Sequence, residues 1–451
     1  MSRFITANRN TDYLLPPSVD EWLPEGHLAR FVVEVVEHLD LSILTRQYAG
    51  RGSAAHHPSV LLGLLIYGYA TGTFSSRKIE RATYDSLAFR YVAGNTHPDH
   101  DTLATFRRRF LSEIEALFVQ VLLLAKTMNV LKLGQIALDG SKVKANASKH
   151  KALSYGRIKQ LEQQLREEVN ALTARAEAAD QESVSDGMDI PAEIARRDDR
   201  LAALAQAKEE LEARAAERDS DAQSAYESKI AARQAQRDTG KKPRGREPKP
   251  PVPGPNDKDQ INLTDEESRI MPVSGGGFDQ CFNVQNGVDT DSLLIVTTHV
   301  TQAPNDKQQI EPALEKLVAL PDDLGKVTEL LADTGYFSRT NVEVCRKAEV
   351  NPLIAMKREA HHPDVFARFA PDAPAPQSDD PVEQMAHRLS TQAGRALYGR
   401  RKQTVETVFG IIKSVLGFRQ FSLRGLASVA GEWSLVAMAW NIKRMNVLRI
   451  A

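Results

Sequence analysis

The chain has 451 residues, enough for two or three domains, because a single hydrophobic core rarely grows beyond ~250–300 residues. Apolar residues make up 42% and charged residues 26% of the sequence, which is an ordinary globular composition. The net charge of −1 at pH 7 excludes a global basic field, so any binding to a polyanion must come from local groups of Lys and Arg.

Three features bear on the compartment. The first residues contain no apolar signal-peptide core. The most apolar run, residues 60–70, is much shorter than the ~20 residues that a membrane span requires. The two cysteines, Cys281 and Cys345, match no zinc or redox spacing and are expected in the core. These features predict a cytoplasmic protein in a reducing compartment, without a membrane partner.

Residues 1–130 have the spacing of short helices. Pro58 is expected to start one helix, since its fixed backbone angle suits a first turn. Ser75 and Ser76 can cap a second helix over residues 77–91, and Asp101 and Thr102 can cap a third. The apolar positions of the third helix are Leu103, Phe106, Phe110, Ile114, Leu117 and Phe118. Such a series suits a DNA-binding helix-turn-helix-like module and a plain helical bundle equally well.

Basic residues in this region form one short run. Arg107, Arg108 and Arg109 are adjacent in the sequence and form a possible phosphate-contacting surface. A charge run of this kind is more often a solvated helix face. Residues 1–130 are therefore predicted to be a helical domain, with DNA binding as its candidate role.

Residues 151–238 are rich in Glu, Arg, Ala and Gln and carry two apolar stripes. The stripes comprise Leu161, Leu165, Val169 and Leu172, then Ile190, Ile194, Leu201, Leu204 and Leu211, with a polar turn at 180–191 between them. We expect a coiled-coil-like helical hairpin that serves as a structural, dimerising or DNA-clamping arm. Residues 239–259 are rich in Pro, Lys and Arg and predict an extended, mobile linker, whose basic residues could contact phosphates.

Beyond the linker the apolar pattern changes to period two. Strands are predicted near 282–289, 293–300, 327–333 and 352–356, with helices at 308–320 and 338–350 and further helices after about residue 385. Together with a strand ending at Asp139, this order is that of an RNase H-like α/β fold interrupted by the helical insertion. The predicted catalytic domain comprises residues 131–150 and 260–425, and residues 426–451 form a C-terminal helix.

Three acidic residues occupy the places where such a fold carries its catalytic carboxylates. Asp139 and Asp333 each follow an apolar run, and Glu406 lies on a late helix. Taken singly, the two aspartates could be turn residues and Glu406 a surface residue. Their joint placement favours a site at the carboxyl ends of the strands that holds a pair of divalent metal ions.

The helix around Glu406 has a distinct apolar face, which comprises Val405, Val408, Phe409, Ile412 and Leu416. Glu406 and Lys413 are two turns apart and share another face, on which the lysine could grip DNA. Arg419 and Arg424 follow in a basic and aromatic stretch of a kind that can touch a DNA backbone.

These residues resemble those of the DDE transposases of bacterial insertion sequences, in the branch with a Tyr-Arg-Glu-Lys signature. The signature here is Tyr398, Arg401, Glu406 and Lys413, with an Arg-to-Glu gap one residue longer than the usual form. Further similar segments are 57–59, 74–80, 105–108, 138–148, 282–289, 332–336 and 431–441, so the resemblance covers almost the whole chain.

The resemblance implies catalysis by Asp139, Asp333 and Glu406, which would also bind two Mg²⁺ ions, with Mn²⁺ as a substitute. It implies DNA contacts by Tyr398, Arg401 and Lys413, to which the basic residues Arg107, Arg108, Arg419 and Arg424 are added. The partners implied are double-stranded DNA, as the element's inverted repeats and target, and a second copy of the chain when two ends are synapsed. A bacterial, nucleoid-associated location follows.

Three other readings remain open from the sequence. An RNase H-like nuclease or resolvase would hydrolyse DNA without strand transfer. An inactive transposase relative would bind DNA only. A metal-independent structural protein could be built around the helical arm.

Overall fold

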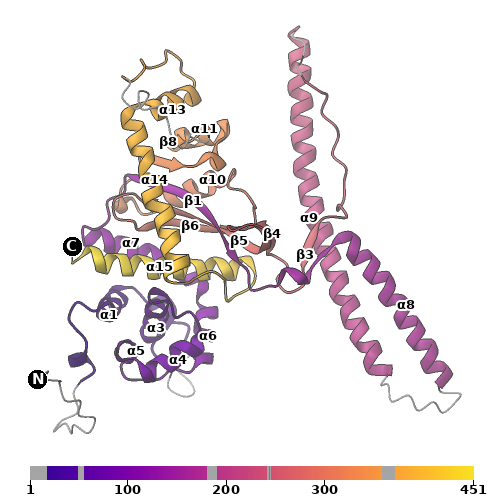
Figure 1. Cartoon of the computed structure of the whole chain (residues 1–451), viewed down its shortest axis with the longest axis horizontal. Helices are drawn as coiled ribbons and strands as arrows, with labels where there is room; N and C mark the ends of the chain where they lie inside the picture. The colour runs from indigo at the N-terminus through magenta and orange to yellow at the C-terminus, as the bar shows by residue number, and fades with distance from the viewer. Residues whose placement is uncertain are drawn as a thin grey trace, which may run out of the picture. The chain divides into compact units, whose positions relative to one another are not determined.

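The computed structural model describes residues 18–48, 55–179, 190–240, 243, 245–357 and 371–450 (Figure 1). The chain divides into two compact units, one formed by Met1–Val143 with Asn283–Ala451 and the other by Lys144–Phe282. Residues 1–17 and most of the predicted turn at 180–191 lie outside the described residues. In the described ranges, no helix combines the length and the apolar content needed to cross a membrane.

The first unit opens with helices, as the apolar spacing predicts. They are α1 (Leu28–His38), α2 (Ser42–Thr45), α3 (Pro58–Ala70), α4 (Ser76–Asp85), α5 (Leu87–Val92), α6 (His100–Arg109) and α7 (Leu111–Thr127). Pro58 occupies the first turn of α3, behind His57, whose ring nitrogen accepts a hydrogen bond from the Ser59 backbone N–H. Most of α3 is buried, so the most apolar run of the sequence is an internal helix.

Three details of the predicted helices are wrong. The helix predicted at 77–91 is two helices, because Ser86 is extended, with φ −117° and ψ 124°. The cap of α6 is Asp99, not Asp101, since Asp99 Oδ1 accepts a hydrogen bond from the Thr102 backbone N–H at 2.7 Å. The apolar run beyond Leu103 is divided at Phe110 into α6 and α7.

A mixed sheet forms the centre of the same unit. Its strands are β1 (Gln135–Lys144), β5 (Phe278–Asp289), β6 (Ile295–Thr301), β7 (Glu329–Ala332) and β8 (Asn351–Ile354), in the spatial order β6-β5-β1-β7-β8. β1, β7 and β8 are parallel, whereas β6 is antiparallel to β5. β4 (Arg269–Pro272) pairs antiparallel with the first residues of β5, which belong to the second unit.

Helices connect and cover the strands of the first unit. They are α10 (Ile310–Val318), α11 (Arg339–Lys347), α13 (Pro381–Ser390), α14 (Gln392–Gly410) and α15 (Leu426–Leu448), with a π-helical turn at Ile411–Val415. Ser338, the first residue of the helix predicted at 338–350, caps α11 by accepting a hydrogen bond from the Asn341 backbone N–H at 3.0 Å. α15 packs against α7, α3 and β6 and buries Trp433 completely, so one core joins the opening helices to the sheet. Cys281 and Cys345 are buried free thiols.

Two long helices dominate the second unit (Figure 1). α8 (Tyr155–Ala179) packs along α9 (Ile190–Asp238), and the short strands β2 (Ala152–Ser154) and β3 (Gln260–Asn262) pair antiparallel at their base. Their shared core comprises Ile158, Leu165, Leu204, Ala207, Leu211 and Ile261. Leu165, Leu204 and Leu211 of the predicted apolar stripes therefore lie in the contact between α8 and α9.

The proline-rich segment beyond α9 is extended, as expected, but it is not free of contacts. Arg233 donates hydrogen bonds to the carbonyls of Gly245 and Arg246 at 2.9 and 3.0 Å, and Arg218 donates to the carbonyl of Gly254 at 3.1 Å. Residues 241, 242 and 244 lie outside the described residues. The described part of the segment therefore contacts α9 through these arginines, and its mobility stays a prediction.

Candidate active site

Asp139 lies on β1, and Asp333 directly follows β7, the neighbouring parallel strand. Gln135 of β1 pairs with Glu329 of β7, and Ala137 pairs with Leu331. Continuing this register by two residues brings Asp139 level with Asp333. Asp139 does not end its strand, as the sequence suggested, because β1 continues to Lys144. The two carboxylates are nevertheless adjacent across the sheet.

Local backbone donors orient both aspartates. The Gly140 backbone N–H donates to Asp139 Oδ1 at 2.8 Å. Asp333 follows β7 directly and caps the short helical turn Thr334–Tyr336, where its Oδ1 accepts the Gly335 N–H at 2.8 Å. In each case one carboxylate oxygen is held by a backbone N–H.

Arg401 of α14 connects Asp139 to Glu406. Its Nη1 lies 3.5 Å from Asp139 Oδ2, and its Nη2 lies 2.8 Å from Glu406 Oε1. The guanidinium is 9% exposed, whereas the Glu406 side chain is 47% exposed. The Tyr398 ring centroid lies 5.9 Å from Arg401 Cζ. A buried cation needs such partners, and here it stands between two of the three predicted carboxylates.

Arg400, the neighbour of Arg401, is directed elsewhere. Its guanidinium donates to Gln135 Oε1 at 2.9 Å and to the Thr290 carbonyl at 3.1 Å, and it pairs with Asp291. Of the two adjacent arginines, Arg401 is therefore the one that faces the carboxylates.

Negative charge at the site is only partly compensated. Burial raises the pKa of Asp139 to about 7, Arg401 opposes this rise, and the nearby charges of Asp333 and Asp306 add to it. A carboxyl whose pKa is raised in this way lacks a sufficient positive partner. The site therefore has an electrostatic preference for an additional cation.

The side chains fit a divalent metal ion in kind. All three predicted ligands offer carboxylate oxygens, which Mg²⁺ prefers. In the part of the chain that the structure describes, however, no three Asp, Glu, His or Cys side chains stand close enough together to hold one ion. Asp139 and Asp333 lie near each other, whereas Glu406 pairs with Arg401.

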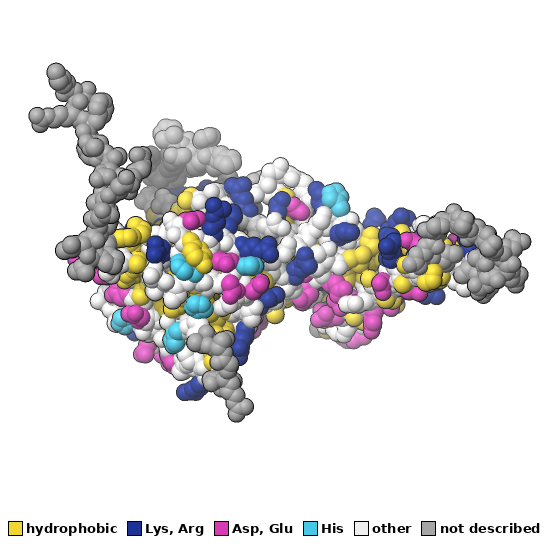
Figure 2. Space-filling model, turned by 90° about the horizontal axis from the view of Figure 1, so that it is seen from below, with side chains coloured by type: hydrophobic (Ala, Val, Ile, Leu, Met, Phe, Trp, Pro, Cys, Tyr) yellow, Lys and Arg dark blue, Asp and Glu magenta, His cyan; other side chains and the backbone are white. Residues whose placement is uncertain are grey.

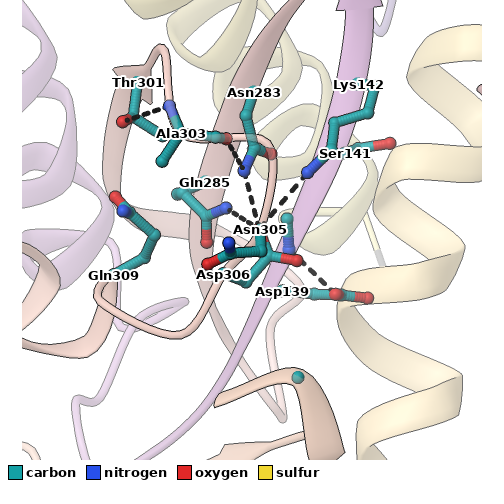
Figure 3. A network of polar contacts seen from close by, with 12 residues as sticks. Asp139, Ser141, Lys142, Asn283, Gln285, Thr301, Ala303, Asn305, Asp306 and Gln309 are labelled. Carbon is teal, nitrogen blue, oxygen red and sulfur yellow. Dashed lines mark hydrogen bonds and ion pairs between the residues drawn. The ribbon is translucent and has the colours of Figure 1, made fainter. Parts of the chain in front are cut away.

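Sequence reasoning missed a second group of polar residues beside Asp139. Figure 3 shows Asn283, Gln285 and Lys142 around the carboxylate of Asp306, with Asp139 nearby. Asn283 and Gln285 alternate with apolar residues on β5. Both are fully buried. The signal in the sequence was a pair of amide side chains two residues apart on one strand. If such amides are buried, they need hydrogen-bond partners, and these partners mark a polar cluster.

Lys413 lies on the π-helical turn that follows α14. Its Nζ donates to Ser141 Oγ and to the Lys142 carbonyl, each at 2.6 Å, so it contacts β1 just beyond Asp139. The prediction that two regular α-helical turns separate Glu406 from Lys413 is wrong in this detail, because a π-turn is wider than an α-turn. Arg419 is exposed and donates to the Lys413 carbonyl at 3.0 Å, and Arg424 is also exposed.

Arg107 and Arg108 have different environments. Arg107 is 8% exposed, donates to Tyr69 Oη at 2.9 Å and lies 3.9 Å from Glu432 Oε1. Its position therefore contradicts the expectation that it contacts phosphates. Arg108 is exposed.

A helical opening region, followed by a mixed sheet with carboxylates on adjacent parallel strands, defines a class of α/β protein with an acidic site. Comparison with family models shows which family of proteins the chain matches. Residues 17–109 match the model described as Transposase domain (DUF772), and residues 257–442 match the model described as Transposase DDE domain. The chain is a DDE transposase of an insertion sequence, a DNA-cleaving and DNA-transferring enzyme, which confirms the resemblance.

The second match includes Asp333 and Glu406, while Asp139 lies between the two matches. DDE transposases normally use a divalent metal ion, and their substrate is DNA. The comparisons with curated proteins and with solved structures gave no match.

Proposed function

We propose that this transposase cuts DNA at the inverted-repeat ends of its own element and joins those ends to target DNA, with Asp139, Asp333 and Glu406 as its catalytic carboxylates. The observation that carries the proposal is the level placement of Asp139 and Asp333 on parallel strands, with Arg401 linking Asp139 to Glu406.

An RNase H-like catalytic core is part of this proposal. Its support is the strand order β6-β5-β1-β7-β8, with β1, β7 and β8 parallel and β6 antiparallel to β5. We assign residues 131–150 and 260–425 to this core, 1–130 to an end-binding domain, 151–238 to the helical insertion and 239–259 to its linker. We assign residues 426–451 to a C-terminal helical segment, in which α15 spans Leu426–Leu448.

The carboxylates would hold two Mg²⁺ ions, which Mn²⁺ can replace. When bound, such a pair activates a water or a 3′-hydroxyl for in-line attack on a phosphodiester and stabilises the leaving oxygen. Asp139 and Asp333 would supply ligands in nearly their present positions. Glu406 would turn away from Arg401, which frees the guanidinium for a phosphate.

The basic residues near the carboxylates would position DNA. Arg401 can present a bidentate fork to a phosphate, with Tyr398 supporting its plane. Lys413, which contacts β1 beside Asp139, would grip the strand next to the cut. Arg419, Arg424 and Arg108 would contact the backbone further away. Arg107 is not among the residues proposed to contact DNA, because it is buried against Tyr69 and Glu432.

Two copies of the chain would act together, because two element ends must be brought together before strand transfer. Figure 2 shows a face on which Lys and Arg form several separate groups with Asp and Glu among them. This agrees with the near-zero net charge. DNA contacts would therefore be local and electrostatic, and end binding should weaken as salt increases.

The test is excision and integration in cells from a donor plasmid that carries the gene with its native flanking DNA. Glu406→Gln should abolish both reactions, because a neutral amide cannot replace a carboxylate ligand. Glu383→Gln, an exposed glutamate on α13, is the matched control and should remain active. Equal activity of Glu406→Gln and wild type would remove Glu406 from the mechanism.

Two other outcomes would point to the competing functions. Cleaved ends without joined products would favour a nuclease. DNA binding without cleavage by the wild type would favour an inactive relative.

A further inference from the structure

Asp306 lies in the segment between β6 and α10, and its carboxylate packs against the backbone of β1. A Cβ atom added at Gly140 would lie 2.4 Å from Asp306 Oδ1 and 2.2 Å from Gln285 Nε2. No side chain fits at residue 140, the residue directly after Asp139. The glycine therefore allows a second carboxylate to approach the strand that carries Asp139.

One oxygen of Asp306 is held by three donors. Oδ1 accepts hydrogen bonds from Asn283 Nδ2 at 2.7 Å and Gln285 Nε2 at 2.6 Å, and Lys142 Nζ lies 3.5 Å away. Two of the three donors are uncharged amides, which fix the carboxylate without neutralising it.

The two amides have defined orientations. Gln285 Oε1 accepts the hydroxyl of Tyr336, so its Nε2 is the atom that faces Asp306. Asn283 Nδ2 also donates to the Ala303 carbonyl at 3.1 Å. Asn283, Gln285 and Tyr336 are all fully buried. The carboxylate of Asp306 is therefore held by side chains that themselves cannot turn easily.

The other oxygen faces the site. Oδ2 receives no hydrogen bond from the described residues, and it lies 3.9 Å from the point where a Cβ at Gly335 would stand. Asp333 Oδ1 lies 3.0 Å from the same point. Asp306 Oδ2 and Asp333 Oδ1 therefore both lie within 4 Å of one point, and the Asp306 side chain is 23% exposed.

We propose that Asp306 is a fourth carboxylate of the catalytic centre and binds a divalent metal ion through Oδ2, beside Asp333. This inference rests on the proposed function. A carboxylate that has one oxygen held by hydrogen bonds and the other oxygen near a second carboxylate is preorganised as a ligand, since the hydrogen bonds orient it before the ion arrives. A purely structural Asp306, by contrast, would only anchor its segment to β5.

The discriminating variant is Asp306→Asn. It retains the oxygen that accepts from Asn283 and Gln285, and it replaces Oδ2 by an amide that cannot bind a cation. Asp333→Asn is the positive control, and Asp323→Asn, an exposed aspartate between α10 and β7, is the matched negative control. Mn²⁺ binding is measured by electron paramagnetic resonance on the full chain, with and without a DNA duplex of the element's end.

We expect Asp306→Asn to weaken Mn²⁺ binding about tenfold or more, the scale seen when groups around a metal are changed, while its melting temperature stays near that of wild type. Mn²⁺ affinity within about twofold of wild type would overturn the inference. If Asp333→Asn alone weakens binding, Asp306 is structural and the proposed function stands. If the wild type binds no Mn²⁺ under either condition, both proposals fail.

Discussion

At the residue scale, the charge balance around Asp139 is the most informative property of the site. The carboxylate has Asp333 and Asp306 as acidic neighbours, and Arg401 is the cation that approaches it, at 3.5 Å. The same guanidinium also forms an ion pair with Glu406. Arg401 is shared by Asp139 and Glu406, and Lys142 pairs with Asp306, so the acids outnumber the cations that pair with them. A bound cation would lower the remaining repulsion.

The raised pKa of Asp139 predicts a pH dependence of stability in the metal-free protein. Burial raises the pKa of Asp139 to about 7. In the unfolded chain an aspartate ionises near pH ~3.9, so between these two values the folded state holds an extra proton, and the free energy of unfolding falls as the pH rises. The contribution of Asp139 is fully present below the unfolded value and is lost as the pH passes about 7.

Denaturant unfolding in the presence of a chelator, at a series of pH values, measures this effect. Asp139→Asn should lose this part of the pH dependence, because its amide does not titrate. Superimposable stability–pH curves for the two proteins would contradict the assignment.

At the element scale, α14 and its continuation bring the signature residues to the sheet. Tyr398, Arg401 and Glu406 lie on α14 itself, and Lys413 lies on the π-turn that follows. Single π-turns occur frequently at functional sites, because they change the direction of the side chains that follow. Here the turn places Lys413 against β1, two residues beyond Asp139.

A buried polar cluster joins α6, α3 and α15. Glu432 is fully buried, and its Oε1 accepts the Tyr69 hydroxyl at 3.0 Å, while Arg107 contacts both residues. Glu432 Oε2 accepts hydrogen bonds from the backbone N–H groups of Ser422 and Leu423 at 2.9 and 3.0 Å. The cluster therefore also fixes the segment that carries Arg419 and Arg424.

Arg107→Met should destabilise the protein strongly, by about 3–5 kcal/mol, because it leaves the charge of Glu432 buried without its cation. Arg108→Met, at the exposed neighbouring position, should change stability by less than about 0.5 kcal/mol and should weaken DNA binding instead. Chemical denaturation and a binding titration separate the two effects. A stable Arg107→Met protein with weakened DNA binding would reverse the assignment.

At the scale of the whole molecule, the proposed catalytic residues and the helical arm belong to different compact units. The arm has its own apolar core, in which Leu204 is 1% exposed. The segment after α9 returns along that helix through hydrogen bonds from Arg218 and Arg233. The second unit is therefore stabilised by contacts of its own.

Leu204→Ala should lower the stability of the second unit by about 2–5 kcal/mol, since it removes a buried side chain and leaves a cavity. Mn²⁺ binding at the acidic site should remain unchanged, because that site is formed by residues of the first unit. Gln206→Ala, at an exposed position on the same helix, is the control. Equal losses of arm stability and of Mn²⁺ affinity in Leu204→Ala would show that the units are coupled.

Local sequence signals were sufficient for several elements and for the family. Apolar spacing predicted α3, and a proline at its first turn located the start. Ser338 located the start of α11, and the apolar run before Asp333 located β7. The acidic residues with the Tyr-Arg-Glu-Lys signature led to the transposase family, which the family models confirm. These signals are local because a helix, a cap or a strand depends on neighbouring residues.

What the sequence could not determine depends on contacts between distant segments. Whether Arg107 faces solvent depends on Tyr69 and Glu432, and whether Asn283 is exposed depends on the segment that carries Asp306. The sequence by itself determined the types of element, the candidate carboxylates and the family. Only the tertiary structure decided which polar faces are covered and which acids face each other, because burial and charge compensation arise when remote parts of the chain pack together.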